Sequence, residues 1–200
     1  MFETPTIEDA TVAMLVGQEF EDVEFEFPLL ALSEVGAHVE VVPIERGQHT
    51  RPYLPDKIVT GRFGSPCPPD VMQEGNRYTV SKLDELSVDD VDCVFFPGGF
   101  SPDNLRILDD VLSFTREAYE RNRIIAAICH APWILLDAGI AEGHEMTCYR
   151  AIREDVVRSD AEFVDEPAVR SDNVVTGRVP DDLPQFCRLV AETIADNESA

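Results

Sequence analysis

The chain has 200 residues, and 39 acidic side chains against 16 basic ones give it a formal net charge of −23. This length suits a single domain with a sizeable core, which we expect to span residues 1–200. A surface so acidic repels nucleic-acid phosphates and anionic lipids, because binding either of them requires a basic patch. A hydrophobic fraction of 44% is too high for a disordered chain. We therefore expect a folded protein that binds neither nucleic acid nor membrane.

The charge also bears on the solvent in which the protein works. Acidic residues are spread along the chain, and among the cations only Lys57 and Lys82 are lysines. High salt screens the self-repulsion of such a surface. We expect a salt-rich cytoplasm of the halophile type, and an ordinary acidic protein with few lysines is the alternative.

The sequence carries no signal for export, disulfides or a metal. Residues 1–10 are acidic and lack the basic and apolar regions of a signal peptide, and no apolar run approaches the roughly 20 residues of a membrane span. The cysteines are odd in number and widely spaced; they are Cys67, Cys93, Cys129, Cys148 and Cys187. We therefore expect a cytoplasmic protein with reduced thiols, no metal and no cofactor, since zinc, phosphate-loop and dinucleotide motifs do not occur.

The first part of the chain alternates between strand and helix. The apolar run 11–17 predicts a buried strand, and 38–44 predicts a second one. Between them, 21–35 predicts a helix that ends at Gly36 and that Pro28 should bend or restart. The apolar residues at helical spacing in this helix are Val23, Phe27, Leu30 and Val35.

A long stretch over 45–82 then breaks the alternation. It holds five prolines and four glycines, and a structureless stretch of this length is uncommon inside a compact domain. We interpret it as an insertion that carries short strands and serves as a flap or an oligomer contact.

The alternation resumes in the second half of the chain. Strands are predicted over 91–96, 123–128 and 146–149, with short ones around 162–175, and helices over 103–122, 131–138, 151–158 and 183–195. Apolar strands that alternate with helices predict an α/β fold whose mostly parallel sheet is covered on both faces.

The most informative residues follow the strand that ends at Ile128. Cys129 stands at a tight strand-to-helix turn, where a residue is held in a strained conformation with its side chain in the site. The helix N-terminus favours a thiolate there, and His130 supplies an adjacent base. This pair predicts a nucleophile that attacks a polarised carbonyl, without distinguishing an amide from an aldehyde.

Two other strand ends should meet this turn, because ligands bind beyond the carboxyl ends of parallel strands. The amides of Gly98 and Gly99, together with that of His130, are expected to form an oxyanion hole. Glu21, which follows the first strand, is expected within reach of the Cys129 sulfur, with its pKa raised by a thiolate.

Four segments together resemble the DJ-1/PfpI superfamily, specifically the PfpI-type intracellular cysteine proteases and deglycases. They are EFEDVEF at 19–25, FFPGGFSPDNLR at 95–106, AAICHAPWILLDAG at 126–139 and TGRVPDDLP at 176–184. The resemblance implies a flavodoxin-like three-layer sandwich that forms dimers or hexamers. It also implies peptidase, glyoxalase or deglycase activity, or a role in stress protection.

The resemblance also implies roles for single residues. Cys129 resembles the family nucleophile, His130 its adjacent histidine, and Glu21 the acid that contacts the sulfur. Asp103 stands where PfpI-type members carry a glutamate that orients the histidine of a neighbouring subunit, and it is one methylene shorter. Ala131 replaces the usual glycine after the histidine.

The leading hypothesis is therefore a cysteine-dependent hydrolase, or a glyoxalase- or deglycase-like enzyme, acting on a small carbonyl compound or a peptide. A redox sensor or chaperone-like protein that oxidises Cys129 reversibly is the alternative from another class. An amidotransferase-like glutaminase also places a cysteine at such a turn, but its histidine lies far along the chain.

Overall fold

The computed structural model describes residues 4–45, 59–69 and 72–198, and a seven-stranded sheet forms its centre. The strand order is β10–β11–β7–β6–β1–β2–β5. The strands are β1 (Thr11–Val16), β2 (His38–Pro43), β5 (Tyr78–Val80), β6 (Cys93–Phe96), β7 (Ile124–Ile128), β10 (Ala168–Ser171) and β11 (Val174–Gly177). Every neighbouring pair is parallel except β10 and β11. The predicted, mostly parallel sheet is confirmed.

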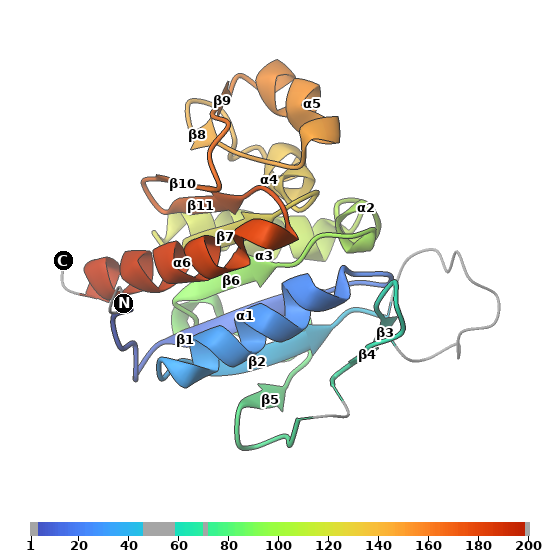
Figure 1. The fold of residues 1–200 in the computed structure, drawn as a ribbon, viewed down its shortest axis with the longest axis vertical. Helices are drawn as coiled ribbons and strands as arrows, with labels where there is room; N and C mark the ends of the chain where they lie inside the picture. The colour runs from blue at the N-terminus through green and yellow to red at the C-terminus, as the bar shows by residue number, and fades with distance from the viewer. Residues whose placement is uncertain (1–3, 46–58, 70–71, 199–200) are drawn as a thin grey trace.

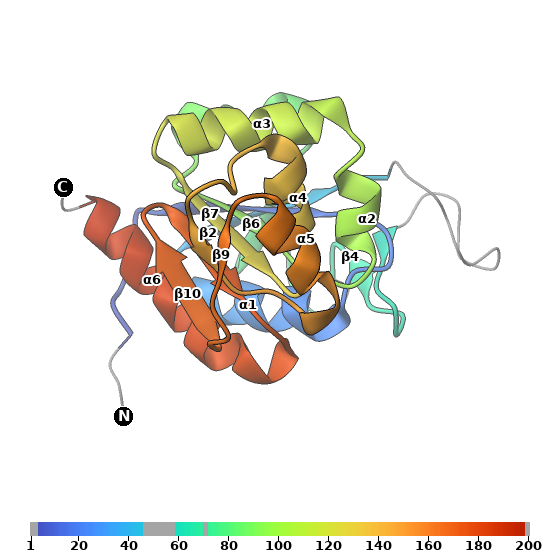
Figure 2. The same ribbon diagram turned by 90° about the horizontal axis from the view of Figure 1, so that it is seen from above.

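Helices cover both faces of this sheet (Figure 1). On one face lie α1 (Asp22–Glu34) and α6 (Leu183–Glu198). On the other lie α3 (Asp109–Glu120) and α4 (Pro132–Ala138), with α2 (Ser101–Leu105) and α5 (Arg153–Arg158) packed against α4. Figure 2 shows the sheet between the two helical layers, so the flavodoxin-like sandwich is confirmed.

Strand β1 shows why the central strands of the sheet are apolar along their length. Val12 and Met14 belong to the core on the α1 and α6 side, whereas Ala13 and Leu15 belong to the core on the α3 and α4 side. Because successive side chains of a strand point to opposite faces, covering both faces demands an unbroken apolar run.

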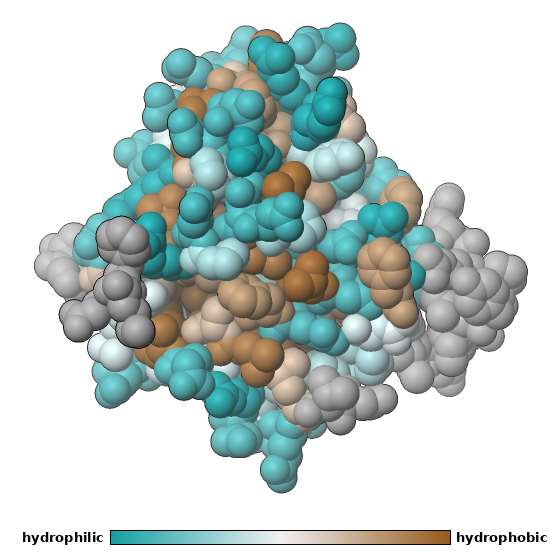
Figure 3. Space-filling model, viewed as in Figure 1, coloured by the Kyte–Doolittle hydropathy of each residue, from teal (hydrophilic) through white to brown (hydrophobic). Residues whose placement is uncertain are grey.

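Helix α1 has the predicted range, and three of the apolar residues noted for their helical spacing lie on its exposed side. Val23, Phe27 and Leu30 are 43%, 37% and 43% exposed. The buried residues of this helix include Phe25, Pro28, Leu29 and Leu32, and the helix continues through Pro28. Apolar residues lie on both the buried and the exposed side of the helix, so their spacing alone does not identify the inner face. Figure 3 shows apolar side chains gathered over α1 and α6 on this side of the molecule.

Several elements of the second half differ in length from the prediction. The helix expected over 103–122 is interrupted between α2 and α3, where Leu108 lies in an extended conformation at the start of α3. The strand expected over 146–149 is β8 (Glu145–Met146), which pairs in parallel with β9 (Glu162–Phe163) outside the main sheet. These short elements carry too few apolar positions for a periodic pattern.

The range interpreted as an insertion contributes to two sheets. β3 (Val59–Thr60) and β4 (Pro66–Cys67) form a small antiparallel hairpin, and β5 joins the main sheet beside β2. Residues 46–58 and 70–71 of this range lie outside the described residues. In the part of the chain that the structure covers, none of the helices has the length and apolar content that a membrane span requires.

Candidate active site

The turn between β7 and α4 holds Cys129 in a strained conformation. Its φ is +64°, in the left-handed region that non-glycine residues rarely adopt. Two long-range hydrogen bonds hold this backbone: Cys129 N–H donates to the Gly177 carbonyl at 3.0 Å, and its own carbonyl accepts from Tyr149 N–H at 2.8 Å. Neighbouring segments therefore maintain a conformation that costs on the order of 1–2 kcal/mol. This is the strained turn that the sequence predicts.

His130 lies directly beside the thiol. Its Nδ1 is 3.3 Å from Cys129 Sγ, and its ring packs between the rings of Tyr149 and Trp133, with centroid distances of 4.8 and 5.4 Å. Partial burial lowers the pKa of His130, and the charge of Arg62 lowers it further, whereas Asp103 acts in the opposite direction. The imidazole is therefore neutral near pH 7 and able to accept a proton.

The carboxyl group that contacts the sulfur belongs to Glu24. This side chain is fully buried, and its Oε2 accepts the Gly98 N–H at 2.9 Å. It is also hydrogen-bonded to the Cys129 side chain. Its Oε1 is buried without a hydrogen-bond partner among the described residues. Burial raises the pKa of Glu24 to about 8, against the opposing hydrogen bond from Gly98. Glu24 is thus a neutral acid at pH 7.

Glu21 lies elsewhere than the sequence suggested. Its carboxylate pairs with the Arg62 guanidinium at 2.9 Å, and the structure gives it no hydrogen bond to Cys129. Glu21 precedes the first residue of α1, and Glu24 stands one turn further along the helix, next to buried Phe25. The sequence gives no signal that separates Glu24 from Glu21, because the spacing of apolar residues in α1 does not identify its buried face.

The thiol itself is more basic than the turn alone would suggest. Burial raises the pKa of Cys129 well above its ordinary value, and the Glu24 carboxyl, once ionised, raises it further. The amides of Gly99 and His130 donate to the sulfur and oppose this shift. Burial thus opposes the thiolate that the field of the seven-residue helix α4 favours at this turn.

The two glycines after β6 serve different purposes. The Gly98 amide is occupied by Glu24, so the amides directed at the sulfur are those of Gly99 and His130. A side chain at Gly98 would collide with Glu24 and with the Cβ atom of Cys129. Gly99 has φ +73° and forms a β-bridge with Phe20. These close approaches explain why glycine stands at both positions.

Asp103 lies near the site without bonding to it. It is exposed on α2, and its carboxylate has no hydrogen bond within the described ranges. It raises the pKa of His130 through its charge alone. Contact with the histidine of a second subunit stays a prediction.

Arg62 is a site residue that sequence reasoning missed. It belongs to the loop between β3 and β4, which Asp22 holds by accepting the N–H groups of Phe63 and Ser65 at 2.9 and 2.8 Å. The Arg62 guanidinium lies 5.2 Å from the centre of the Phe100 ring. An arginine in a proline- and glycine-rich stretch gives no signal of its own, because only the tertiary fold brings this loop to Glu21.

The described residues include no group of His, Cys, Asp or Glu side chains arranged to hold a metal ion.

Comparison of the chain with known proteins shows the family to which it belongs. The model of the DJ-1/PfpI family matches residues 10–193. The chain belongs to the DJ-1/PfpI family. It is 35% identical to "Putative cysteine protease YraA" of Bacillus subtilis, over 88% of this chain and 94% of that protein. It is 34% identical to "Protein/nucleic acid deglycase 2" of Escherichia coli, over 88% and 93%.

A solved structure agrees with this assignment at the level of the fold. Drosophila melanogaster DJ-1beta superimposes with a TM-score of 0.78 at 24% sequence identity, covering 94% of this chain and 91% of that one. The family assignment agrees with the resemblance of the four sequence segments.

Proposed function

We propose that this DJ-1/PfpI protein is a cysteine-dependent enzyme that attacks polarised carbonyl groups, as a peptidase or as a glyoxalase or deglycase. The observation that carries the proposal is the contact at 3.3 Å between the Cys129 thiol and the neutral imidazole of His130, at a residue with φ +64°. A nucleophile within reach of a base is the arrangement that covalent catalysis requires.

The first step uses each group of the site. The Cys129 sulfur forms a bond to the carbonyl carbon, its proton passes to His130 Nδ1, and the carbonyl π electrons move to oxygen. The Gly99 and His130 amides, which lie against the sulfur, are the nearest donors for that oxygen. Protonated Glu24 adds no charge to oppose the negative sulfur and can donate to it.

The later steps differ with the substrate. From a peptide, His130 returns the proton to the leaving amine, and water then hydrolyses the acyl–sulfur bond. From methylglyoxal, the first product is a hemithioacetal. Transfer of a proton from the former aldehyde carbon to the former ketone carbon gives a thioester of lactate, which water hydrolyses to lactate and free thiol. The relatives named as a protease and as a deglycase support both routes.

A matched pair of cysteine variants tests the proposal. Lactate release from methylglyoxal and hydrolysis of an unstructured peptide are measured for the wild type, Cys129→Ala and Cys187→Ala, whose cysteine is buried on α6 away from the site. We expect at least one activity to fall about 1000-fold or more in Cys129→Ala, as for loss of a catalytic nucleophile, and to stay within about twofold in Cys187→Ala. Undiminished activity in Cys129→Ala contradicts the proposal.

A redox role is the second candidate, and Glu24 is the observation that favours it. A carboxyl that keeps its proton to about pH 8 can donate a hydrogen bond to an oxidised sulfur. Peroxide would convert the Cys129 thiol to a sulfenic acid with release of water, and a second peroxide would give the sulfinic acid. Mass spectrometry after mild peroxide treatment supports this role if oxidation is confined to Cys129 and contradicts it if all five cysteines react alike.

We propose a cytoplasmic homo-oligomer, a dimer or a hexamer, as the working form, with a role in stress protection. Five free cysteines suit a reducing compartment. The exposed Val23, Phe27 and Leu30 of α1 suit contact with a second copy.

A further inference from the structure

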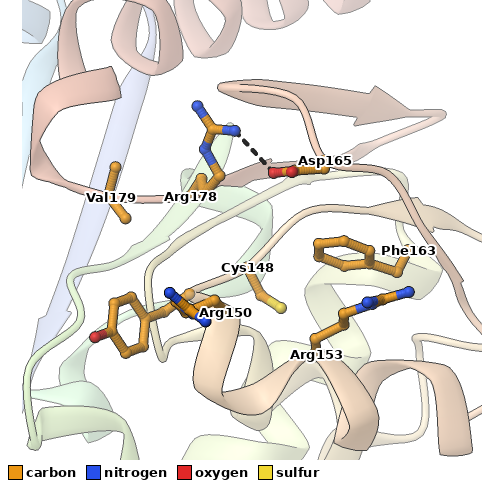
Figure 4. Close-up of a pocket in the computed structure, with 8 residues that line it drawn as sticks. Cys148, Arg150, Arg153, Phe163, Asp165, Arg178 and Val179 are labelled. Atoms are coloured by element: carbon orange, nitrogen blue, oxygen red, sulfur yellow. Dashed lines mark hydrogen bonds and ion pairs between the residues drawn. The ribbon is translucent and has the colours of Figure 1, made fainter.

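A cavity adjoins the proposed active site. It has a volume of about 400 Å³ and is lined on one side by the segment Cys148–Arg150 and on the other by Arg178. Figure 4 shows the labelled arginine and phenylalanine side chains around it. Tyr149 belongs to both places, because it lines this cavity and packs against the ring of His130 at 4.8 Å. A ligand in the cavity therefore sits one aromatic ring away from the proposed base.

Positive charge is concentrated here in a strongly acidic protein. Three arginines, Arg150, Arg153 and Arg178, line the cavity together with a single carboxylate, Asp165. Eight of the twelve described arginines form ion pairs with carboxylates. Arg150 and Arg153 form none within the described part of the chain. Two uncompensated guanidinium groups at one cavity are what an oxyanion requires for charge-assisted hydrogen bonds.

The remaining groups keep this cavity positive and ordered. Arg178 donates to Asp165 at 2.8 Å and to Asp182 at 3.0 Å, so this arginine is fully paired and the free positive charge of the cavity belongs to Arg150 and Arg153. The Arg153 guanidinium lies 5.1 Å from the centre of the Phe163 ring. Burial raises the pKa of the Cys148 thiol to about 12, so this cysteine adds no negative charge near pH 7.

We propose that this cavity binds a carboxylate or phosphate group that the substrate carries several bonds away from its reacting carbonyl. The link to the substrate rests on the proposed function, whereas the anion site itself does not. The shared ring of Tyr149 sets the separation: a small neutral dicarbonyl fits at Cys129 alone, and an acidic peptide or a phosphorylated carbonyl compound reaches both places.

Binding is tested with inorganic phosphate and with succinate, each titrated calorimetrically into Cys129→Ala protein at constant ionic strength. The same titrations are made with Arg150→Gln/Arg153→Gln and with Arg121→Gln/Arg170→Gln added to that background. The second pair removes the same charge from two arginines that form ion pairs elsewhere. We expect one bound anion, and a Kd that rises about tenfold or more only in the first pair. The tighter of the two probes identifies phosphate or carboxylate as the natural group.

Two results overturn the anion site: equal affinity in all three proteins, which indicates general screening, or no binding by the Cys129→Ala protein. Because no turnover is measured, this experiment remains decisive even if the proposed enzyme activity fails. The link to the substrate is tested separately with active protein. The bound probe should compete with an acidic peptide substrate and raise its KM, and inhibition that leaves KM unchanged contradicts the link.

Discussion

The turn at Cys129 and the cavity at Cys148 lie on either side of one residue, Tyr149. The chemical groups that surround the two cysteines are different. Both cysteines are buried, and burial raises the pKa of both thiols. Only Cys129 has a left-handed backbone, an imidazole nitrogen at 3.3 Å and a hydrogen-bonded carboxyl. Around Cys148 the functional groups are arginine side chains.

This difference shows how reactivity and binding are divided in the protein. At the turn, backbone strain, two amides and a buried acid act on one sulfur atom, so small displacements are costly. At the cavity, long side chains supply charge, so single substitutions should weaken binding gradually. The predictions below test this division, beginning with the largest expected effect.

Adding a side chain at Gly98 should cause the largest loss of catalytic activity among these predictions. In Gly98→Ala, the new methyl group collides with Glu24 and Cys129, so the acid and the sulfur must separate. We expect kcat/KM to fall by about 100-fold or more, since misplacement of about 1 Å has costs of this size.

Gly143→Ala is the matched control for this substitution. Gly143 has φ +80°, and an added Cβ has no atom within 4 Å. It should cost about 1 kcal/mol of stability and leave the activity unchanged. Comparable losses of activity in both variants contradict the role of the Gly98 contact.

The dependence of kcat/KM on pH should have an acid limb set by His130 and an alkaline limb set by Glu24. Protonation of His130 removes the base below a pKa that is lowered from 6.5, and ionisation of Glu24 near pH 8 places a negative charge beside the sulfur. We expect a bell-shaped kcat/KM, with a decline of about tenfold between pH 7.5 and 9. Glu24→Gln should remove the alkaline limb, and a limb that persists in this variant contradicts the assignment.

Glu24 also couples stability to pH. Its folded-state pKa of about 8 exceeds the unfolded value of 4.5, so the folded protein binds the extra proton between these values. The free energy of unfolding should therefore fall by a few kcal/mol from pH 4.5 to 8 through this group. Denaturation of the wild type and of Glu24→Gln across this range checks the sign, and equal slopes in the two proteins contradict it.

Arg62 should have a moderate effect that appears mainly at acidic pH. Its charge lowers the pKa of His130, so Arg62→Gln should raise that pKa and move the acid limb to higher pH. At pH 6 we expect a several-fold loss of activity, and at pH 7.5 about twofold or less. Arg77→Gln, whose arginine pairs with Glu34, is the control. If the acid limb of the activity profile moves equally in Arg62→Gln and Arg77→Gln, the effect of Arg62 on His130 is not local and the prediction is contradicted.

The smallest expected effect concerns assembly. A net charge of −23 opposes association of copies, and salt screens this repulsion. Light scattering should show a lower average mass when salt is lowered from about 2 M to 0.1 M. Over this range the electrostatic screening length increases severalfold, so the copies repel one another more strongly. The same mass at both concentrations contradicts the interpretation of the surface as adapted to salt.

Much of the fold, and the centre of the site, could be predicted from local sequence. The central strands β1, β6 and β7 are short apolar runs, and Cys129–His130 directly follows one of them, so the position of the turn needed no knowledge of distant residues. The inner face of α1 could not be predicted, because Val23, Phe27 and Leu30 match a helical stripe as well as the buried residues do.

The remainder of the site depends on tertiary structure. Glu21 and Glu24 lie three residues apart, and only the direction in which α1 leaves β1 decides which of them is buried at the sulfur. Arg62 lies in the loop between β3 and β4, and the anion cavity brings together Arg150, Phe163 and Arg178 from separate segments. Such contacts leave no periodic or spacing signal in a single sequence.

The central claim is that the turn makes Cys129, among five buried cysteines, the nucleophile of this protein. The most direct measurement is the alkylation rate of each cysteine by iodoacetamide under native conditions, followed by peptide mass spectrometry, in the wild type and in His130→Gln. We predict that Cys129 reacts about 100-fold faster than Cys148 and that the loss of His130 slows Cys129 alone. Equal rates at Cys129 and Cys148, or a rate at Cys129 that does not depend on His130, would contradict the account.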